Sequence, residues 1–160
     1  MVDRDIVAAK LAELSTRIER AGKHCPASSA ALAEDQDALD LVSFNLLLAV
    51  QSSLDLASHI IADEGWPPAT SFAQAFRRLA ERQVLSPATA TALAQAAGLR
   101  NLVAHGYSGV DVARVHHAAT TGLADLRRFV TVHDPAMVGA RRKPQTRNRS
   151  ARPLLQRWGV

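Results

Sequence analysis

The chain has 160 residues, enough for one domain with a buried core, and 48% of them are hydrophobic although only 4% are aromatic. Ala and Leu are common while the usual strand formers are sparse, so the composition favours an all-α fold. Cys25, the single cysteine, excludes an internal disulfide and fits a reducing compartment. With no apolar run of eighteen residues and no basic-then-apolar start, we expect neither a membrane span nor a signal peptide, and hence a soluble cytoplasmic protein.

The net charge of +4 is unevenly distributed along the chain. Residues 1–138 carry 12 Lys and Arg against 15 Asp and Glu, whereas residues 139–160 carry seven basic residues and no acidic one. Such a block of like charge typically stays disordered and often contacts polyanions. We therefore expect a helical domain over residues 1–136 and a disordered basic tail over 137–160, which could follow an RNA backbone, bind an acidic partner or have no role.

Apolar residues at helical spacing predict five helices: one from Asp3 or Asp5 to about Ala21, and others at about 29–63, 71–83, 87–105 and 110–132. Their lengths and short connections predict a four- to five-helix antiparallel bundle. The second predicted helix is apolar on nearly all sides. It therefore needs to bury one face in its own core and another against a partner surface.

The end of the fourth predicted helix carries four chemically active side chains within eight residues: Arg100, Asn101, His105 and Tyr107. The bare spacing, Arg-x4-His-x-Tyr, is a weak pattern, because two cations at a helix end are also explained by the helix dipole. Its context is more specific. Asn follows Arg directly, and Gly106 between His and Tyr is expected to close the helix.

The string over residues 98–111 resembles the HEPN superfamily, and within it the HepT-type toxins that are paired with minimal nucleotidyltransferase antitoxins. The resemblance extends to residues 51–61, to Trp66-Pro67 and to residues 71–79, and it covers roughly residues 1–135. It implies a metal-independent endoribonuclease with no cofactor of its own. This enzyme would be the toxin of a type VII-like toxin–antitoxin pair and would act on RNA, such as tRNA.

The roles that the resemblance implies suit the chemistry of these side chains. The 2′-hydroxyl of RNA would be the nucleophile, and His105 would act as general base or acid, since imidazole titrates near neutral pH. Arg100 would stabilise the negative charge that develops on the phosphate. Asn101 would hold the imidazole or the ribose by a hydrogen bond.

Tyr107 could assist at the phosphate, but the resemblance implies a second role for it. In HepT-like pairs the nucleotidyltransferase antitoxin uses ATP to adenylylate the tyrosine of this motif. AMP on the phenol would add a bulky, negatively charged group beside the site and would repel an RNA backbone. We therefore expect a nucleotidyltransferase partner that controls the chain through Tyr107.

The spacing of Arg100 and His105 limits how the two residues can meet. Five residues along an α-helix turn through about 500°, which leaves the two positions about 140° apart around its axis. Either the helix ends before His105, or two chains contribute to each site. Since the HEPN proteins that this chain resembles are dimers with the motif at their interface, we expect a homodimer or a larger assembly.

Other polar residues are less specific. Gln51, Asp55 and His59 form a row at i, i+4 and i+8 on the second predicted helix. Asp55 could orient a side chain of the motif, with Gln51 and His59 beside it, or the row could be a polar seam between helices. His116 and His117 are expected at the surface, and no metal site is predicted, because no cluster of Cys or carboxylates accompanies them.

Two other classes of function remain open. A non-catalytic HEPN-like adaptor would bind a nucleotidyltransferase or a nucleotide and cut nothing, and it would not require the complete motif. A nucleic-acid binder that uses the basic tail is a weaker alternative, because no helix of the body is suited to reading a groove. The acidic body also counts against the enzyme, unless Arg100, doubled in a dimer, makes the site locally basic.

Overall fold

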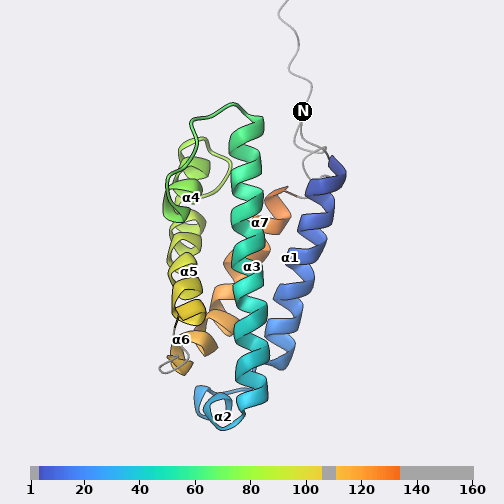
Figure 1. Cartoon of the computed structure of the whole chain (residues 1–160), viewed down its shortest axis with the longest axis vertical. Helices are drawn as coiled ribbons and strands as arrows, with labels where there is room; N and C mark the ends of the chain where they lie inside the picture. Colours follow the sequence, from blue (N-terminus) through green and yellow to red (C-terminus); the bar gives the residue numbers. More distant parts are fainter. Residues whose placement is uncertain (1–3, 106–110, 134–160) are drawn as a thin grey trace, which may run out of the picture.

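The computed structural model describes the backbone of residues 4–105 and 111–133, and the regular structure within these ranges is entirely helical (Figure 1). Side chains are described for residues 7–98 and 111–131. In chain order the elements are α1 (Arg4–His24), α2 (Ser29–Glu34), α3 (Gln36–Asp63), α4 (Phe72–Glu81), α5 (Pro87–His105), α6 (Val112–His117), the π-helical segment η1 (Ala118–Gly122) and α7 (Leu123–His133). The expected all-α bundle is confirmed, while the basic tail lies outside the described residues.

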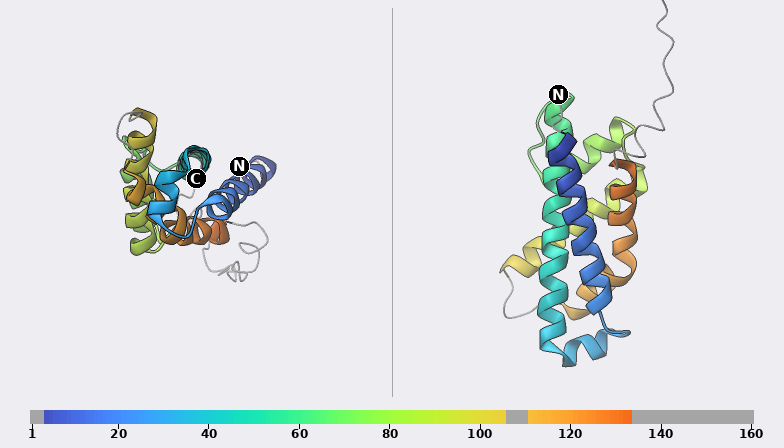
Figure 2. Two further views of the ribbon diagram at one scale, coloured as in Figure 1. Left: turned by 90° about the horizontal axis from the view of Figure 1, so that it is seen from below. Right: turned by 90° about the vertical axis from the view of Figure 1, so that its right-hand side faces the viewer.

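Helix α3 is the central element of the bundle. It is flanked by α1 on one side and by α4 and α5 on the other, and α6 and α7 pack behind it in the view of Figure 1 (Figures 1 and 2). With a rise of about 1.5 Å per residue, α3 is about 42 Å long. Its buried apolar side chains fill the spaces between it and its neighbours, among them Leu46, Val50, Leu54 and Ile61.

By length and composition alone, α3 would be apolar enough to cross a membrane. However, 61% of its most apolar window is buried inside the bundle, which is the pattern of a core helix in a globular protein. The apolar surface that the sequence places around α3 is therefore mostly covered by helices of the same chain.

An aromatic pair joins α4 to α7. The rings of Phe76 and Phe129 are completely buried, with centroids 6.1 Å apart and planes at 90°. This edge-to-face geometry places the positive edge of one ring against the negative face of the other. The short α4 is thereby fixed to the last helix although some fifty residues separate them in the chain.

Five helices begin after a polar side chain that accepts a hydrogen bond from the backbone N–H three residues further on, at 2.9–3.2 Å. Such an acceptor satisfies one of the N–H groups that the first turn leaves without an intrahelical partner. The capping residues are Ser28, Asp35, Ser71, Ser86 and Asp111.

One of these caps divides the second predicted helix, so the prediction of a single helix over 29–63 was wrong. The backbone of Asp35 is extended, with φ −114° and ψ 92°, and its carboxylate accepts a hydrogen bond from Ala38 at 2.9 Å. The apolar spacing continues across this point, because Leu32 and Leu39 are both buried. Apolar spacing therefore gave no sign of the break.

Helix α1 also departs from its predicted end, since it continues through Gly22 to His24. A Cβ atom at position 22 would lie 3.2 Å from Cδ1 of Leu123, which is tighter than ordinary contact. The glycine therefore allows α1 to pack closely on the start of α7 and does not end the helix.

The last predicted helix, 110–132, is formed in three consecutive parts: α6, η1 and α7. In η1 the backbone hydrogen bonds span one residue more than in an α-helix. The hydroxyl of Thr120 donates to the carbonyl of His116 at 2.8 Å and lies 3.3 Å from the carbonyl of His117. The Thr120 hydroxyl thus provides a hydrogen-bond donor for backbone carbonyls where α6 passes into the π-helical segment.

Asp35→Ala should lower the free energy of unfolding by about 1 kcal/mol, because an N–H group at the start of α3 loses its acceptor. Asp35→Asn keeps a side-chain acceptor and should stay close to the wild type. Urea denaturation followed by circular dichroism measures both variants. Equal stability of the two would contradict the capping role of Asp35.

Candidate functional site

Helix α5 carries the motif at its C-terminal end. Its backbone is helical as far as His105, which places Arg100, Asn101 and His105 on its last two turns. The side chains of these three residues, and the whole of Tyr107, lie outside the described residues. The structure therefore gives the positions of Arg100, Asn101 and His105 around the helix axis, and their contacts stay a prediction.

The first part of α5 is anchored in the bundle. Ala90, Leu93 and Ala97 are buried against α3 and α4. Because α5 runs antiparallel to α3, its last turns lie beside the first half of α3, toward α2 and α6 (Figure 1). The end of α5 that carries the motif is thus at a defined place on a rigid scaffold.

The continuity of α5 fixes where Arg100 and His105 lie around the helix axis. The helix does not end before His105, so the two positions lie about 140° apart around one axis. Arg100 follows Ala96 by four residues and lies on the same side of α5, the side toward α6 and α7. His105 follows Ala96 by nine residues and lies about 180° further round. The described helix therefore places the two catalytic candidates on different sides.

One side of α3 is left uncovered by the described helices. Leu41, Phe44 and Leu48 lie along it at steps of three and four residues; Phe44 is 53% exposed and the two leucines are partly exposed. The last turns of α5 project past α3 on this side (Figure 2). An apolar strip and the end of the motif helix thus share one face of the molecule.

The row of Gln51, Asp55 and His59 runs along the second half of α3. The carboxylate of Asp55 accepts a hydrogen bond from Gln51 at 3.0 Å and forms an ion pair with Lys10 of α1 at 3.3 Å. Nε2 of His59 is buried without a hydrogen-bond partner among the described residues. The Lys10 ion pair joins α1 to α3 at a partly exposed position, whereas a role for Asp55 in orienting the motif stays a prediction.

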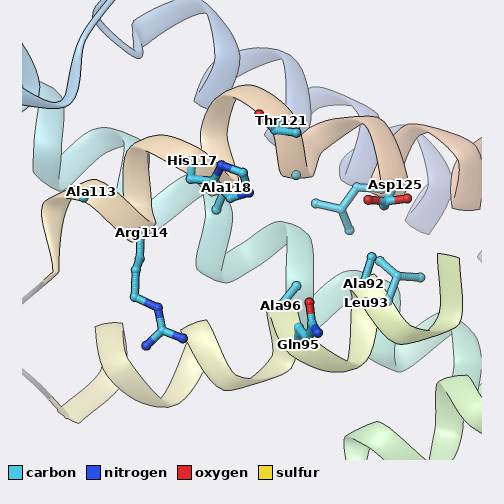
Figure 3. A pocket seen from close by; sticks show the side chains of 12 residues that line it. Ala92, Leu93, Gln95, Ala96, Ala113, Arg114, His117, Ala118, Thr121 and Asp125 are labelled. Carbon is cyan, nitrogen blue, oxygen red and sulfur yellow. The ribbon is translucent and has the colours of Figure 1, made fainter. Parts of the chain in front are cut away.

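A cavity of about 430 Å³ lies between α5 and the last helices (Figure 3). Its polar lining comes from Gln95 on α5 and from Arg114, His117, Thr121 and Asp125 opposite. His117 is exposed, as predicted, but its place in this lining and that of Arg114 were not predicted. The signal was available, because these four residues of the last helix follow one another at steps of three and four.

His116, in contrast, has a structural role. Its Nε2 lies 3.0 Å from the carbonyl oxygen of Pro26 and so ties α6 to the loop after α1. In that loop, burial raises the pKa of the Cys25 thiol above its ordinary value, which disfavours the reactive thiolate. Within residues 4–105 and 111–133, no three His, Cys, Asp or Glu side chains come together as metal ligands would.

Comparison with protein families matches residues 14–132 to the model of the HepT-like ribonucleases. A curated relative, the mRNA nuclease HepT of Shewanella oneidensis, is 25% identical over 128 residues, which cover 80% of this chain and 96% of that protein. The match therefore extends over nearly the whole relative.

Solved structures agree with this match. The tri-AMPylated HEPN toxin of Shewanella oneidensis, solved in complex with an MNT antitoxin, superposes with a TM-score of 0.74 at 25% identity, covering 82% of this chain and 97% of that one. YutE of Bacillus subtilis, a cytosolic protein of unknown function, has the same TM-score at 12% identity, with 87% and 93% covered, and shares the fold. Because the family model matches residues 14–132, well over half of the chain, the chain belongs to the HepT-like ribonuclease family of the HEPN superfamily.

Proposed function

We propose that the chain is the ribonuclease toxin of a two-component toxin–antitoxin system, acting in the cytoplasm. The family match over residues 14–132 carries the proposal, and the four motif residues lie within that range. The name of the curated relative makes mRNA the first substrate to test, ahead of the tRNA that the sequence suggested. Residues 1–136 form the catalytic domain, and the seven basic residues after position 138 offer charge that attracts the RNA backbone.

The chemistry uses the RNA itself as the source of the nucleophile. His105 removes the proton from the 2′-hydroxyl or donates one to the leaving oxygen, which contributes on the order of 10²–10⁴-fold to the rate. Arg100 binds the phosphate oxygens on which charge develops. Asn101 orients the imidazole or the ribose, and no metal ion or cofactor takes part in these steps.

The active unit is a homodimer in which each site takes groups from two chains. Arg100 and His105 of one chain lie on different sides of the straight α5, whereas two α5 helices that face each other bring together one residue from each. The apolar strip of Leu41, Phe44 and Leu48 lies on the face past which α5 projects, so a second copy that covers this strip also meets the motif. This pairing is isologous, as in most protein dimers.

The partner is a nucleotidyltransferase antitoxin that consumes ATP and modifies Tyr107. The structural relative is AMPylated and bound to an MNT antitoxin, which supports the same partnership for this chain. Each AMP group adds negative charge two residues from His105. An RNA phosphate and a modified tyrosine then repel each other, and the nuclease is silenced.

Expression of the chain alone should arrest growth and deplete RNA, and His105→Ala should abolish both, because about 10²–10⁴-fold in rate is lost with the proton-transfer group. His24→Ala, which removes an exposed histidine on α1, is the matched control and should remain toxic. Growth curves and RNA sequencing after induction measure the effect. If His105→Ala is as toxic as the wild type, the chain is instead an adaptor that harms cells by binding.

Co-expression with a minimal nucleotidyltransferase antitoxin should increase the mass of the chain by one or more AMP groups and remove its toxicity. The modification should map to the peptide that contains Tyr107, and Tyr107→Phe should prevent it. Intact-mass and peptide mass spectrometry measure both. An unmodified Tyr107 in a non-toxic co-expressed sample would show that the antitoxin acts by binding alone.

The chain should sediment as a dimer at micromolar concentration, and Phe44→Asp should shift it toward the monomer, because a charge would be buried in an apolar interface. Ala12→Asp adds the same charge to an exposed position of α1 and should leave the dimer intact. Analytical ultracentrifugation measures both variants. A monomeric wild type would remove the dimer from the proposal.

Mixing inactive Arg100→Ala and His105→Ala chains tests whether the site is shared. A mixed dimer would contain one site with both functional residues, so random pairing of equal amounts should restore about a quarter of the wild-type cleavage rate. Cleavage of a fluorescent RNA measures the recovery. A mixture that stays inactive while mixed dimers form would show that each site needs Arg100 and His105 from the same chain.

A further inference from the structure

The cavity between α5 and the last helices is not used by the proposed catalytic steps (Figure 3). Its volume of about 430 Å³ falls in the usual range of small-molecule sites, roughly 300–1,000 Å³. A Cβ atom built at Gly122 would have no neighbour closer than 3.8 Å, so close packing does not require a small residue there. Many of the residues that line the cavity are nevertheless small, among them Ala92, Ala96, Ala113, Ala118 and Gly122.

Two exposed polar side chains, Arg114 and His117, line this cavity from α6. In Figure 3, Arg114 extends from α6 toward α5, and His117 lies beside Ala118 in the space between the helices. Among the described side chains, none forms a hydrogen bond or an ion pair with the guanidinium of Arg114 or the imidazole of His117. Both groups are therefore available to a bound molecule.

Asp125, the acidic residue of the cavity lining, does not repel an anion bound near Arg114 and His117. Asp125 lies at the opposite end, and its carboxylate accepts a hydrogen bond from Nη1 of Arg128 at 2.8 Å. The negative charge of Asp125 is thus offset by its own partner. Arg114 remains as the unpaired charge of the lining, while Gln95 and Thr121 add groups that can donate or accept hydrogen bonds.

We infer that this cavity binds one nucleotide of single-stranded RNA, an inference that rests on the proposed function. The base enters between the aliphatic walls and stacks on the imidazole of His117, as bases of unpaired RNA stack on aromatic side chains. The adjoining phosphate binds the guanidinium fork of Arg114. Gln95 and Thr121 reach the polar edge of the base, so these two residues set its preference.

The position of the cavity relates this nucleotide to the cleaved bond. Ala96 lines the cavity, and Arg100 lies one helical turn further on the same side of α5, a rise of about 6 Å. In Figure 3, Arg114 stands at the end of the cavity that lies toward the C-terminal end of α5, and that end of the helix carries the motif. The bound nucleotide is therefore a neighbour of the one whose phosphate Arg100 holds.

The test measures binding without cleavage. The probe is a fluorescein-labelled 2′-O-methyl oligonucleotide of mixed sequence, which lacks the nucleophilic hydroxyl and stays intact. Arg114→Ala removes the charge and Ala118→Leu fills the cavity. Arg20→Ala and Ala12→Leu make the same changes at exposed positions of α1 and serve as matched controls.

Fluorescence anisotropy over a range of salt concentrations should separate the two contributions. Arg114→Ala should weaken binding about tenfold and lower the salt slope by about 0.7, the value for one phosphate on a single strand. Ala118→Leu should weaken binding about tenfold through the lost base contact and leave the salt slope unchanged. The two controls should bind like the wild type. Should Ala118→Leu unfold the chain, Thr121→Leu fills the same cavity from an exposed position.

The inference is overturned if the wild type does not bind the probe, or if the variants of the cavity bind it as the controls do. A separate assay measures cleavage of unmodified RNA, with His105→Ala as the inactive reference. It distinguishes failure of the proposed nuclease from failure of the proposed nucleotide site. Binding with the expected changes but no cleavage by the wild type supports the nucleotide site and contradicts the nuclease. Cleavage with unaltered binding by the cavity variants supports the nuclease and contradicts the site.

Discussion

The surface of α3 is apolar around most of its circumference, and the rest of the bundle is arranged to remove it from water. A fully buried Leu, Val or Phe side chain contributes roughly 1.5–3 kcal/mol, and α3 buries such residues toward α1, toward α4 and α5, and toward the last helices. The fourth side keeps Phe44 largely exposed. One chain alone therefore leaves part of the apolar surface of α3 in water. This exposed side is the one past which the motif helix projects (Figure 2).

The period of the α-helix is the second constraint, and it acts on α5. Because α5 is continuous to His105, Arg100 and His105 lie about 140° apart around its axis. The helix is roughly 10 Å in diameter with its side chains. In the proposed arrangement, the Arg100 and the His105 that meet one phosphate come from two different helices. Association through the open side of α3 would bring two such helices together, so that the same contact buries apolar surface and completes the site. Fold stability, assembly and activity would then depend on one interface.

The features predicted correctly from the sequence are those that local patterns determine. Apolar spacing located the third and fourth predicted helices, which Ser71 and Ser86 cap, and the string around Arg100 identified the family. The features that were missed depend on contacts between distant segments. The role of Gly22 is set by Leu123, about a hundred residues away, and the partner of Asp55 is Lys10 on another helix.

The break at Asp35 and the π-helical segment were missed for a different reason. Both keep the apolar spacing of the surrounding helix, so hydrophobic periodicity cannot detect them. The cavity was missed because its lining combines residues of α5 with residues of α6 to α7, and small side chains such as Ala96 and Ala118 give no signal in a sequence. What the sequence did contain was the regular spacing of Arg114, His117, Thr121 and Asp125 on one face.

Arg114 and the cavity lie on the side of α5 where Arg100 is placed, and His105 lies on the other side. In the proposed dimer, one chain therefore binds the nucleotide and stabilises the charge on the phosphate, while its partner supplies proton transfer. The helical body is acidic overall, so the proposed site depends on Arg100 and Arg114 for its local positive charge. A single chain would then bind RNA weakly and leave it intact, and cleavage would begin only when a second α5 brings its histidine to the bound strand.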